Sequence, residues 1–140
     1  VIAIAFLFVL PSVGSRQMDK SVLEKNLSVK RAYEKPSGED GVRVLVDRLW
    51  PRGVRKADAA IDHWFKELSP STELRKWFAH DLTRWSEFRE RFKRELSQRG
   101  DQLNQLRALA SQGPVTLVYA ARDELHNDAV VLRDVLLARH

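Results

Sequence analysis

Polar side chains that could bind an anion follow the apolar run 42–46 of this 140-residue chain. Asp47 and Arg48 come directly after that run, and Arg52 follows, with Trp50 between the two arginines. An arginine presents a planar fork of donors that matches a phosphate or a carboxylate. An aspartate beside it can accept or return a proton. These residues therefore predict one half of a site for an anionic ligand.

A second group of polar side chains lies at the end of the apolar run 115–121 and just beyond it. The residues that could reach a ligand from there are Tyr119, Arg122, Asp123, His126 and Asn127. Because an imidazole titrates near neutral pH, His126 is predicted to share proton transfer with Asp47 if the site is catalytic. The competing interpretation is structural: an aspartate–arginine network ties the two loops together, Trp50 covers the edge of the sheet, and His126 is an ordinary surface residue.

Two strands must bring these groups together. The run 42–46 is apolar on both faces, which predicts a central strand of a covered sheet. If it lies parallel to the strand predicted at 115–121, the carboxyl ends of the two strands are about 5 Å apart. Ligands of open α/β sheets bind outside such ends, and the start of the next helix, near Glu124 or Asn127, would add backbone donors. The alternating segment 27–33 predicts a third strand.

Helical periodicity predicts most of the remaining chain. We expect a first helix beginning near Ala59, with the apolar stripe Ile61, Trp64, Phe65 and Leu68, and a second beginning at Ser69-Pro70, with Leu74, Trp77 and Phe78 inside. A third helix should be capped by Asp81 and carry the stripe Leu82, Trp85, Phe88, Phe92 and Leu96. A fourth should end at Gly113-Pro114, and a fifth should form the C-terminus. Residues 18–26 are predicted to be a polar lead-in. Strands interleaved with helices predict the α/β class: a single layered domain with a small, mostly parallel sheet flanked by about five helices. The strand order stays open.

Composition restricts the function classes. The chain has no cysteine, which excludes disulfides, thiol nucleophiles and cysteine-ligated metals. His80, His126 and Asp123 lack a recognisable metal-ligand spacing, so no metal site is predicted, and the sequence names no cofactor. It contains no glycine-rich dinucleotide loop, P-loop or nucleophile elbow. The net charge of +5 is spread along the chain, which favours a solvated surface over a nucleic-acid footprint.

The N-terminal stretch differs from the rest of the chain. Residues 1–10 are all apolar, but a bilayer span needs about 20 such residues. No basic segment precedes them, and the sole methionine is Met18. We therefore expect residues 1–17 to be either an extension upstream of the true start or a truncated signal sequence. We exclude them from the fold and predict one domain over residues 18–140, cytoplasmic and without membrane association.

Four segments of the chain resemble a known family. They are RVLVDRLWPRG at 43–53, ELRKWFAHD at 73–81, WSEFRERFKREL at 85–96 and GPVTLVYAARDELHNDAVVL at 113–132. In this order they resemble the YeaO-like proteins, a branch of the domain of unknown function 488, over about residues 27–138. The resemblance implies a small bacterial, cytoplasmic protein without an established activity. Other branches place cysteines and a His-Arg pair after the last strand. This chain has Ala120 and Ala121 there, so thiol chemistry does not transfer.

The first functional hypothesis is a site for an anionic small molecule, bearing a phosphate or a nucleotide, at the strand ends, with catalysis undecided. Asp47 and His126 would handle protons, while the anion would be held mainly by arginines. The predicted ligand-binding residues are Arg48, Trp50, Arg52, Tyr119, Arg122, Asp123 and Asn127. The alternatives are a nucleic-acid-binding module, suggested by the basic balance, and an interaction subunit without a ligand. The oligomeric state is not predicted.

Overall fold

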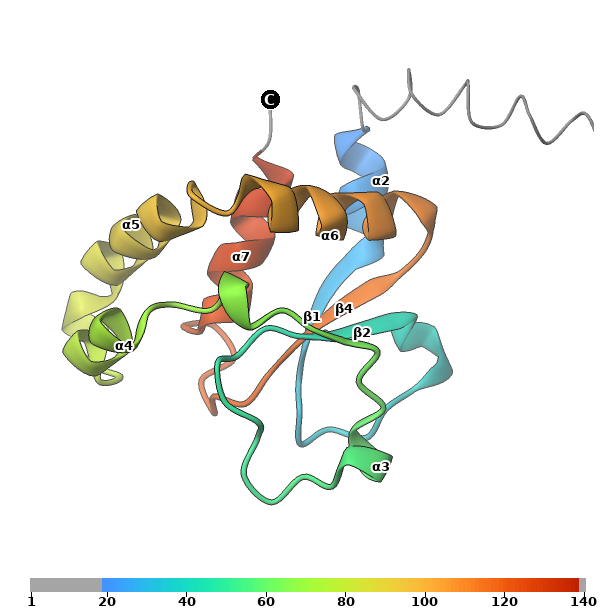
Figure 1. The fold of residues 1–140 in the computed structure, drawn as a ribbon, viewed down its shortest axis with the longest axis horizontal. Helices are drawn as coiled ribbons and strands as arrows, with labels where there is room; N and C mark the ends of the chain where they lie inside the picture. The colour runs from blue at the N-terminus through green and yellow to red at the C-terminus, as the bar shows by residue number, and fades with distance from the viewer. Residues whose placement is uncertain (1–18, 139–140) are drawn as a thin grey trace, which may run out of the picture.

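A four-stranded parallel sheet forms the centre of the protein (Figure 1). The structure, a computed structural model, describes residues 19–138, so the predictions for residues 1–17 and for Met18 lie outside it. The strands stand in the order β1-β4-β2-β3, with bounds Leu27–Arg31 for β1, Val115–Tyr119 for β4, Val42–Leu45 for β2 and His63–Trp64 for β3. The helices are α2 (Lys20–Asn26), α3 (Lys56–Ala59), α4 (Thr72–Phe78), α5 (Trp85–Leu96), α6 (Gly100–Gln112) and α7 (Asp128–Leu137). The predicted α/β class is confirmed.

The two strands on which the predicted site depends are parallel neighbours. Val44 of β2 lies opposite Leu117 of β4, and Leu45 lies opposite Val118. One further backbone hydrogen bond, from Val46 N–H to the oxygen of Val118 at 3.1 Å, extends the pairing past β2. Both strands therefore end at the same edge of the sheet, as the sequence analysis required.

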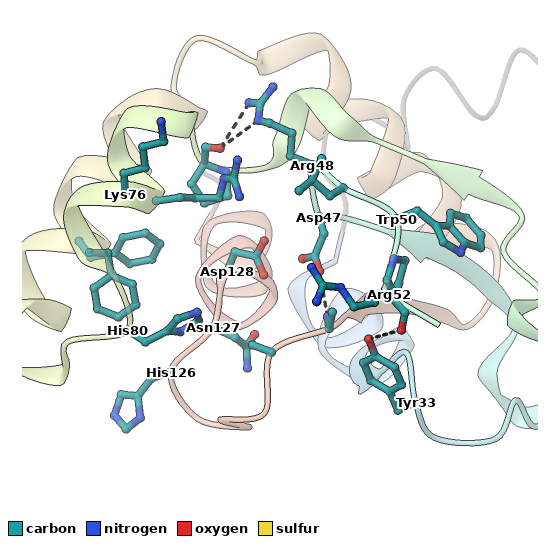
Figure 2. Close-up of a pocket in the computed structure, with 18 residues that line it drawn as sticks. Tyr33, Asp47, Arg48, Trp50, Arg52, Lys76, His80, His126, Asn127 and Asp128 are labelled. Atoms are coloured by element: carbon teal, nitrogen blue, oxygen red, sulfur yellow. Dashed lines mark hydrogen bonds between the residues drawn. The ribbon is translucent and has the colours of Figure 1, made fainter. Parts of the chain in front are cut away.

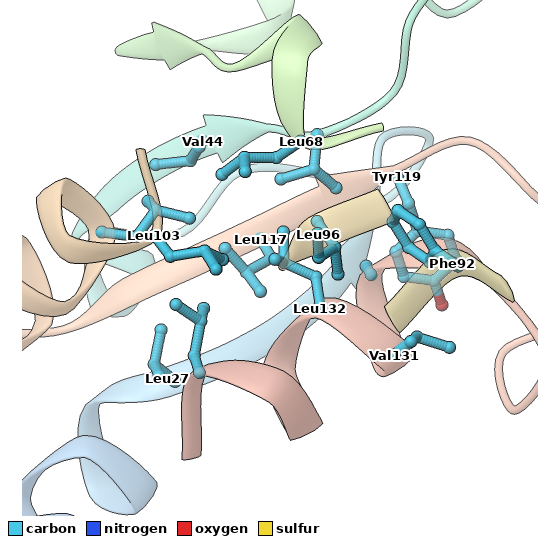
Figure 3. Packing of buried hydrophobic residues seen from close by; sticks show 14 of the residues in the cluster. Leu27, Val44, Leu68, Phe92, Leu96, Leu103, Leu117, Tyr119, Val131 and Leu132 are labelled. Carbon is cyan, nitrogen blue, oxygen red and sulfur yellow. The ribbon is translucent and has the colours of Figure 1, made fainter. Parts of the chain in front are cut away.

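Helices cover one face of the sheet and loops cover the other. On the helical face, α2, α5, α6 and α7 surround alternate strand residues, and Figure 3 shows Phe92, Leu117 and Leu132 in that core. Their side chains have no more than a trace of exposed surface because the strands and helices interdigitate there. On the opposite face a smaller cluster of Ala32, Leu45 and Val118 packs against Trp50 of the loop after β2 and against Ile61 and Trp64. The loop after β2 also lines the candidate site.

The prediction of a helix that begins near Ala59 is wrong. The chain there forms the short helix α3, the edge strand β3 and a 3-10 turn at Lys66–Leu68. Pairing with β2 decides the outcome: Asp62 N–H donates to the oxygen of Arg43 at 2.8 Å, and Phe65 N–H donates to the oxygen of Leu45 at 2.9 Å. The apolar spacing that imitates a helix arises because Ile61 and Trp64 pack against the smaller cluster, whereas Phe65 and Leu68 pack in the main core.

Three other element boundaries differ from the predictions. Helix α4 begins at Thr72 and is capped by Ser71 rather than Ser69, because Glu95 of α5 holds Ser71 through its N–H at 2.8 Å and its hydroxyl at 2.7 Å. Residues 20–26, predicted to be a lead-in, form helix α2 with Asp19 as its cap. Leu82, assigned to the buried stripe of the third helix, is 53% exposed because it lies in the 3-10 turn before α5. Within residues 19–138, every helix is too short or too polar to cross a bilayer.

Candidate functional site

A cavity of about 600 Å³ opens at the carboxyl ends of β2 and β4 (Figure 2). This volume is in the range of small-molecule sites. The walls come from the loop after β1, the loop after β2, helix α4, the end of β4 and the start of α7. They consist of Tyr33, Asp47, Arg48, Leu49, Trp50, Pro51, Arg52, Pro70, Arg75, Lys76, Phe78, His80, Phe88, Ala120, Ala121, His126, Asn127 and Asp128.

The structure brings most, but not all, of the predicted site residues to this cavity. Those that line it are Asp47, Arg48, Trp50, Arg52, His126 and Asn127. Tyr119, Arg122 and Asp123 do not line it. Tyr119 is 2% exposed and lies in the main core, and burial raises the pKa of its hydroxyl above the ordinary value. Arg122 is exposed on the loop surface, and Asp123 bonds to the loop itself.

Asp47 is fixed at the end of β2 by both its backbone and its side chain. The indole Nε1 of Trp64 donates to the backbone oxygen of Asp47 at 2.7 Å, and Ala120 N–H donates to its Oδ2 at 2.9 Å. The carboxyl group is also hydrogen-bonded to that of Asp128. Burial raises the pKa of Asp47 above its ordinary value, although the hydrogen bonds and the charge of Arg75 act in the opposite direction.

Asp128, the first residue of α7, completes a carboxyl pair in the cavity. Burial raises the pKa of Asp128 well above its ordinary value, and the negative charge of Asp47 raises it further. Burial and the proximity of the two carboxyl groups therefore both disfavour the state in which Asp47 and Asp128 are charged together. The sequence analysis did not select Asp128, because an acidic residue in the first turn of a helix is common for reasons unrelated to ligands.

Several backbone N–H groups between β4 and the first turn of α7 are already bound within the chain. Their acceptors are Asp47 for Ala120, Asp123 for Leu125 and His126, Asn127 for Val130, and Asp128 for Ala129. The sequence analysis expected the start of the last helix to offer free donors to an anion. In the structure, side chains adjacent in the sequence or at the end of β2 accept some of these hydrogen bonds, so only part of the expected set of donors is already used.

The polar side chains after β2 hold the loops in place. Arg48 donates from Nε and Nη2 to the backbone oxygen of Pro70, both at 3.3 Å. Trp50 Nε1 donates to the backbone oxygen of Val54 at 2.6 Å, and the Trp50 ring packs edge-on against Trp64. The competing structural interpretation thus accounts for part of what these residues do, although the bonds run to backbone oxygens and not between aspartates and arginines.

Helix α4 supplies two cations that the sequence analysis did not select, Arg75 and Lys76. The Nε of Arg75 is buried and has no hydrogen-bond partner among residues 19–138. Its positive charge acts to lower the pKa of Asp47. No sequence signal pointed to these residues, since α4 reaches the strand ends only through long-range contacts of the segment before it, such as those of Ser71 with Glu95.

The two histidines of the cavity lie at its rim. The Nδ1 of His126 is 3.0 Å from Oδ2 of Asp123, and the ring meets Trp85 edge-on at 5.1 Å. In Figure 2 the ring of His126 is directed away from Asp47 and Asp128, so the two predicted proton carriers do not face each other. His80 follows α4 with a left-handed backbone (φ 57°), a strained conformation for a residue with a side chain.

Replacing Asp128 with asparagine is expected to stabilise the protein at about pH 8 by roughly 1–3 kcal/mol, the usual penalty of a buried unpaired polar group. Unfolded Asp128 loses its proton near its ordinary pKa, whereas the folded protein retains it to higher pH. The unfolded state therefore binds fewer protons, and the free energy of unfolding falls as the pH rises from about 4 through the raised pKa. Asparagine imitates the protonated acid. Urea unfolding at several pH values measures the effect.

The matched control for this prediction is Asp123→Asn. Asp123 accepts N–H groups from Leu125 and His126, which hold the pKa of its carboxyl below the ordinary value. Its charged form is favoured by folding, so asparagine should lower the stability at pH values above the ordinary pKa of aspartate. Equal losses of stability in the two variants at about pH 8 would mean that Asp128 is charged in the folded protein.

Comparisons with known proteins agree on one family. The family described as "Inactive DUF488-N3 subclade" matches residues 26–140. The uncharacterised protein YeaO of Escherichia coli (strain K12) is 45% identical over 111 residues, which cover 79% of this chain and 96% of that protein. An uncharacterised protein of Mycobacterium tuberculosis is 42% identical over 118 residues, covering 84% of this chain and 99% of that protein. No solved structure matches the chain at a significant level.

Proposed function

This chain belongs to the inactive DUF488-N3 subclade, and from that premise we propose that it binds an anionic small molecule without turning it over. The ligand carries a phosphate or a nucleotide, and the site is the cavity at the ends of β2 and β4. The residues proposed to attract it lie in the loop after β2 and in helix α4.

The charge balance of the cavity carries this proposal. Four cationic side chains line it: Arg48, Arg52, Arg75 and Lys76. The acidic side chains of the lining are only two, Asp47 and Asp128, and burial raises the pKa of both, so the cations outnumber the carboxylates. A concave site with an excess of one sign of charge concentrates ligands of the other sign, because the low-dielectric walls focus the field.

The state of Arg75 further supports an anionic ligand. A buried guanidinium nitrogen without an acceptor loses its hydration without compensation, at about 1–3 kcal/mol. A phosphate oxygen in the cavity would supply that acceptor. Arg48 is partly engaged by Pro70, so Arg75 and Lys76 on α4, with Arg52 opposite, are the main proposed anion-binding groups.

Binding without turnover is favoured by the state of the acid–base groups. The Asp47 carboxyl accepts Ala120 N–H and is bonded to Asp128, while His126 is held by Asp123 at the rim. A general acid–base pair must reach the same reacting group within hydrogen-bond distance. Neither the orientation of these two residues nor the family description favours that role.

Titration calorimetry with inorganic phosphate and nucleoside monophosphates tests the proposal. Arg75→Met should weaken binding by about 10- to 100-fold, the range expected for loss of a charged hydrogen bond. The matched control is Arg122→Met, which removes an exposed arginine next to the cavity and should change the affinity less than about threefold.

A second variant tests the proposal independently in case Arg75→Met fails to fold. Lys76 is exposed, so Lys76→Met should leave the urea midpoint unchanged and still weaken binding. The proposal is wrong if no probe binds the native protein. It is also wrong if a probe binds the native protein, Arg75→Met and Lys76→Met with equal affinity, since the anion would then bind elsewhere.

A further inference from the structure

Building on the proposed anion binding, we propose that the ligand of the cavity is a free nucleoside monophosphate whose base stacks on the ring of Tyr33. The phosphate of this ligand is the anion of the proposed function, and the base is the new element. Tyr33 lies two residues after β1, and it was not selected as a site residue in the sequence analysis.

Tyr33 is an exposed aromatic residue whose orientation is fixed. It lines the cavity and is 47% exposed. Its hydroxyl donates to the backbone oxygen of Arg52 at 2.8 Å, as Figure 2 shows, and the guanidinium of Arg31 lies over the ring, 5.1 Å from its centroid. Fixing a half-exposed side chain costs conformational entropy that the small buried area offsets only in part. A ligand that covers the ring would supply the missing burial.

The cation over the ring is itself anchored at the cavity wall. Arg31 donates from Nε to the backbone oxygen of Ala121 at 2.9 Å and from Nη2 to that of Ala120 at 3.5 Å. Both alanines line the cavity. Tyr33 is therefore held by two segments of the wall, the loop after β2 and the end of β4. A ring that is already in place can bind a flat ligand without a further loss of side-chain entropy.

Tyr33 also has aromatic surface that is free for a ligand. The large apolar side chains that are exposed within residues 19–138 are Val22, Tyr33, Leu49, Leu82 and Leu125, and two of them, Tyr33 and Leu49, line the cavity. Phe78 and Phe88 line it as well, but they are only 6% and 3% exposed and stack on each other with their centroids 4.4 Å apart. Among the phenyl and phenol rings of the wall, Tyr33 is therefore the one on which a base can stack.

The cations proposed to bind the phosphate line the same cavity as this ring. Arg52 is held at its backbone by the Tyr33 hydroxyl, and Arg75 and Lys76 line the cavity from helix α4. The volume of about 600 Å³ is in the range of whole small molecules and exceeds the need of a phosphate alone. Because every base has a π-face, stacking on Tyr33 selects nucleotides as a class and not one particular base.

The charges beyond the cavity favour a free nucleotide over the end of a nucleic-acid strand. A longer strand would need further cations along its path. The next cations of the loop after β2, Arg55 and Lys56, do not line the cavity, and Arg55 lies 3.7 Å from the carboxylate of Asp58.

Two probes that differ in the base test this inference: AMP and ribose 5-phosphate. Calorimetry on the native protein should give AMP at least about a tenfold lower Kd, as expected when one base stacks on an aromatic side chain. Inorganic phosphate, titrated in parallel, reports on the anion site without a sugar or a base.

Two substitutions at Tyr33 separate the ring from the hydroxyl. Tyr33→Leu removes the ring, so the ratio of the two Kd values should fall below about threefold. Tyr33→Phe keeps the ring and removes the bond to Arg52, so most of the ratio should remain. The matched control Leu125→Ala alters an exposed apolar residue outside the cavity and should keep the full ratio. Urea unfolding of each variant verifies that it folds.

Each outcome decides the question. Equal affinity of the native protein for AMP and ribose 5-phosphate overturns the stacking of a base and leaves the anion site in place. A preference for AMP that Tyr33→Leu retains overturns the role of Tyr33. A 5′-phosphorylated dinucleotide that binds more than about tenfold more tightly than AMP overturns the free nucleotide, since its second unit must then contact the protein outside the cavity. If AMP, ribose 5-phosphate and inorganic phosphate all fail to bind, the proposed function fails and the assignment of a nucleotide fails with it.

Discussion

Gly41→Ala is expected to destabilise the protein by about 3 kcal/mol or more. The backbone of Gly41 is left-handed (φ +66°), which costs a residue with a Cβ roughly 1–2 kcal/mol. A Cβ built there lies 2.1 Å from the backbone oxygen of Pro114, and relieving such overpacking typically adds about 1–3 kcal/mol. Urea or thermal unfolding measures the loss.

The position of Gly41 explains why the effect should reach the candidate site. The N–H of Val42, the next residue, donates to the same oxygen of Pro114 at 3.0 Å, and this bond begins the pairing of β2 with β4. Moving the two strands apart at that end would disturb the register that brings Asp47 to Ala120 at the other. Anion affinity should therefore fall along with stability in this variant.

Two other glycines provide matched controls. Gly53 also has a positive φ, +81°, but a Cβ there meets nothing within 4 Å, so Gly53→Ala should lose only about 1 kcal/mol. Gly38 has neither feature, and Gly38→Ala should change the stability by less than about 0.5 kcal/mol. If Gly41→Ala loses no more than Gly53→Ala, the strands can shift at little expense and the close approach to Pro114 is not structurally important.

The sequence predicted the strands of the site better than the segments between them. The run 42–46 is apolar except for Arg43, and the run 115–121 is followed directly by polar residues, so both strands can be recognised in the sequence. The stripe from Ile61 to Leu68 has the spacing of a helix, but pairing with β2 places its residues in two different cores. Local periodicity cannot distinguish these arrangements, since each buries the same residues.

The site was predicted in part for a similar reason. Residues that follow the strands directly, such as Asp47 and Asn127, are placed by chain connectivity and do line the cavity. Tyr119 is excluded by strand alternation, because it shares a face with Leu117, and that signal was available in the sequence. Arg75 was not predictable, since its position depends on how α4 packs against α5.

Asp40→Asn is expected to destabilise the protein by about 3–5 kcal/mol, the range for removing one partner of a buried ion pair. Arg43 is 3% exposed, and its Nη1 donates to Oδ2 of Asp40 at 2.6 Å. Lys30 of β1 donates to the same carboxylate at 3.1 Å, and the backbone oxygen of Asp40 accepts the hydroxyl of Thr116 of β4 at 2.8 Å. Asp40 therefore joins three strands on the face that the helices leave uncovered. Urea unfolding at neutral pH measures the loss.

The pH dependence separates this ion pair from mere packing. Burial alone would raise the pKa of Asp40, but Ser37 N–H, Lys30 and Arg43 together hold it below the ordinary value. Stability from this carboxylate is therefore complete above about pH 4 and is lost as the pH falls through the lowered pKa of the folded protein. Asp40→Asn should lack this acid-dependent loss, whereas the exposed control Glu39→Gln should keep it. If Asp40→Asn and the native protein lose stability in parallel below about pH 4, the carboxylate charge does not stabilise Arg43 and the three strands are held by packing alone.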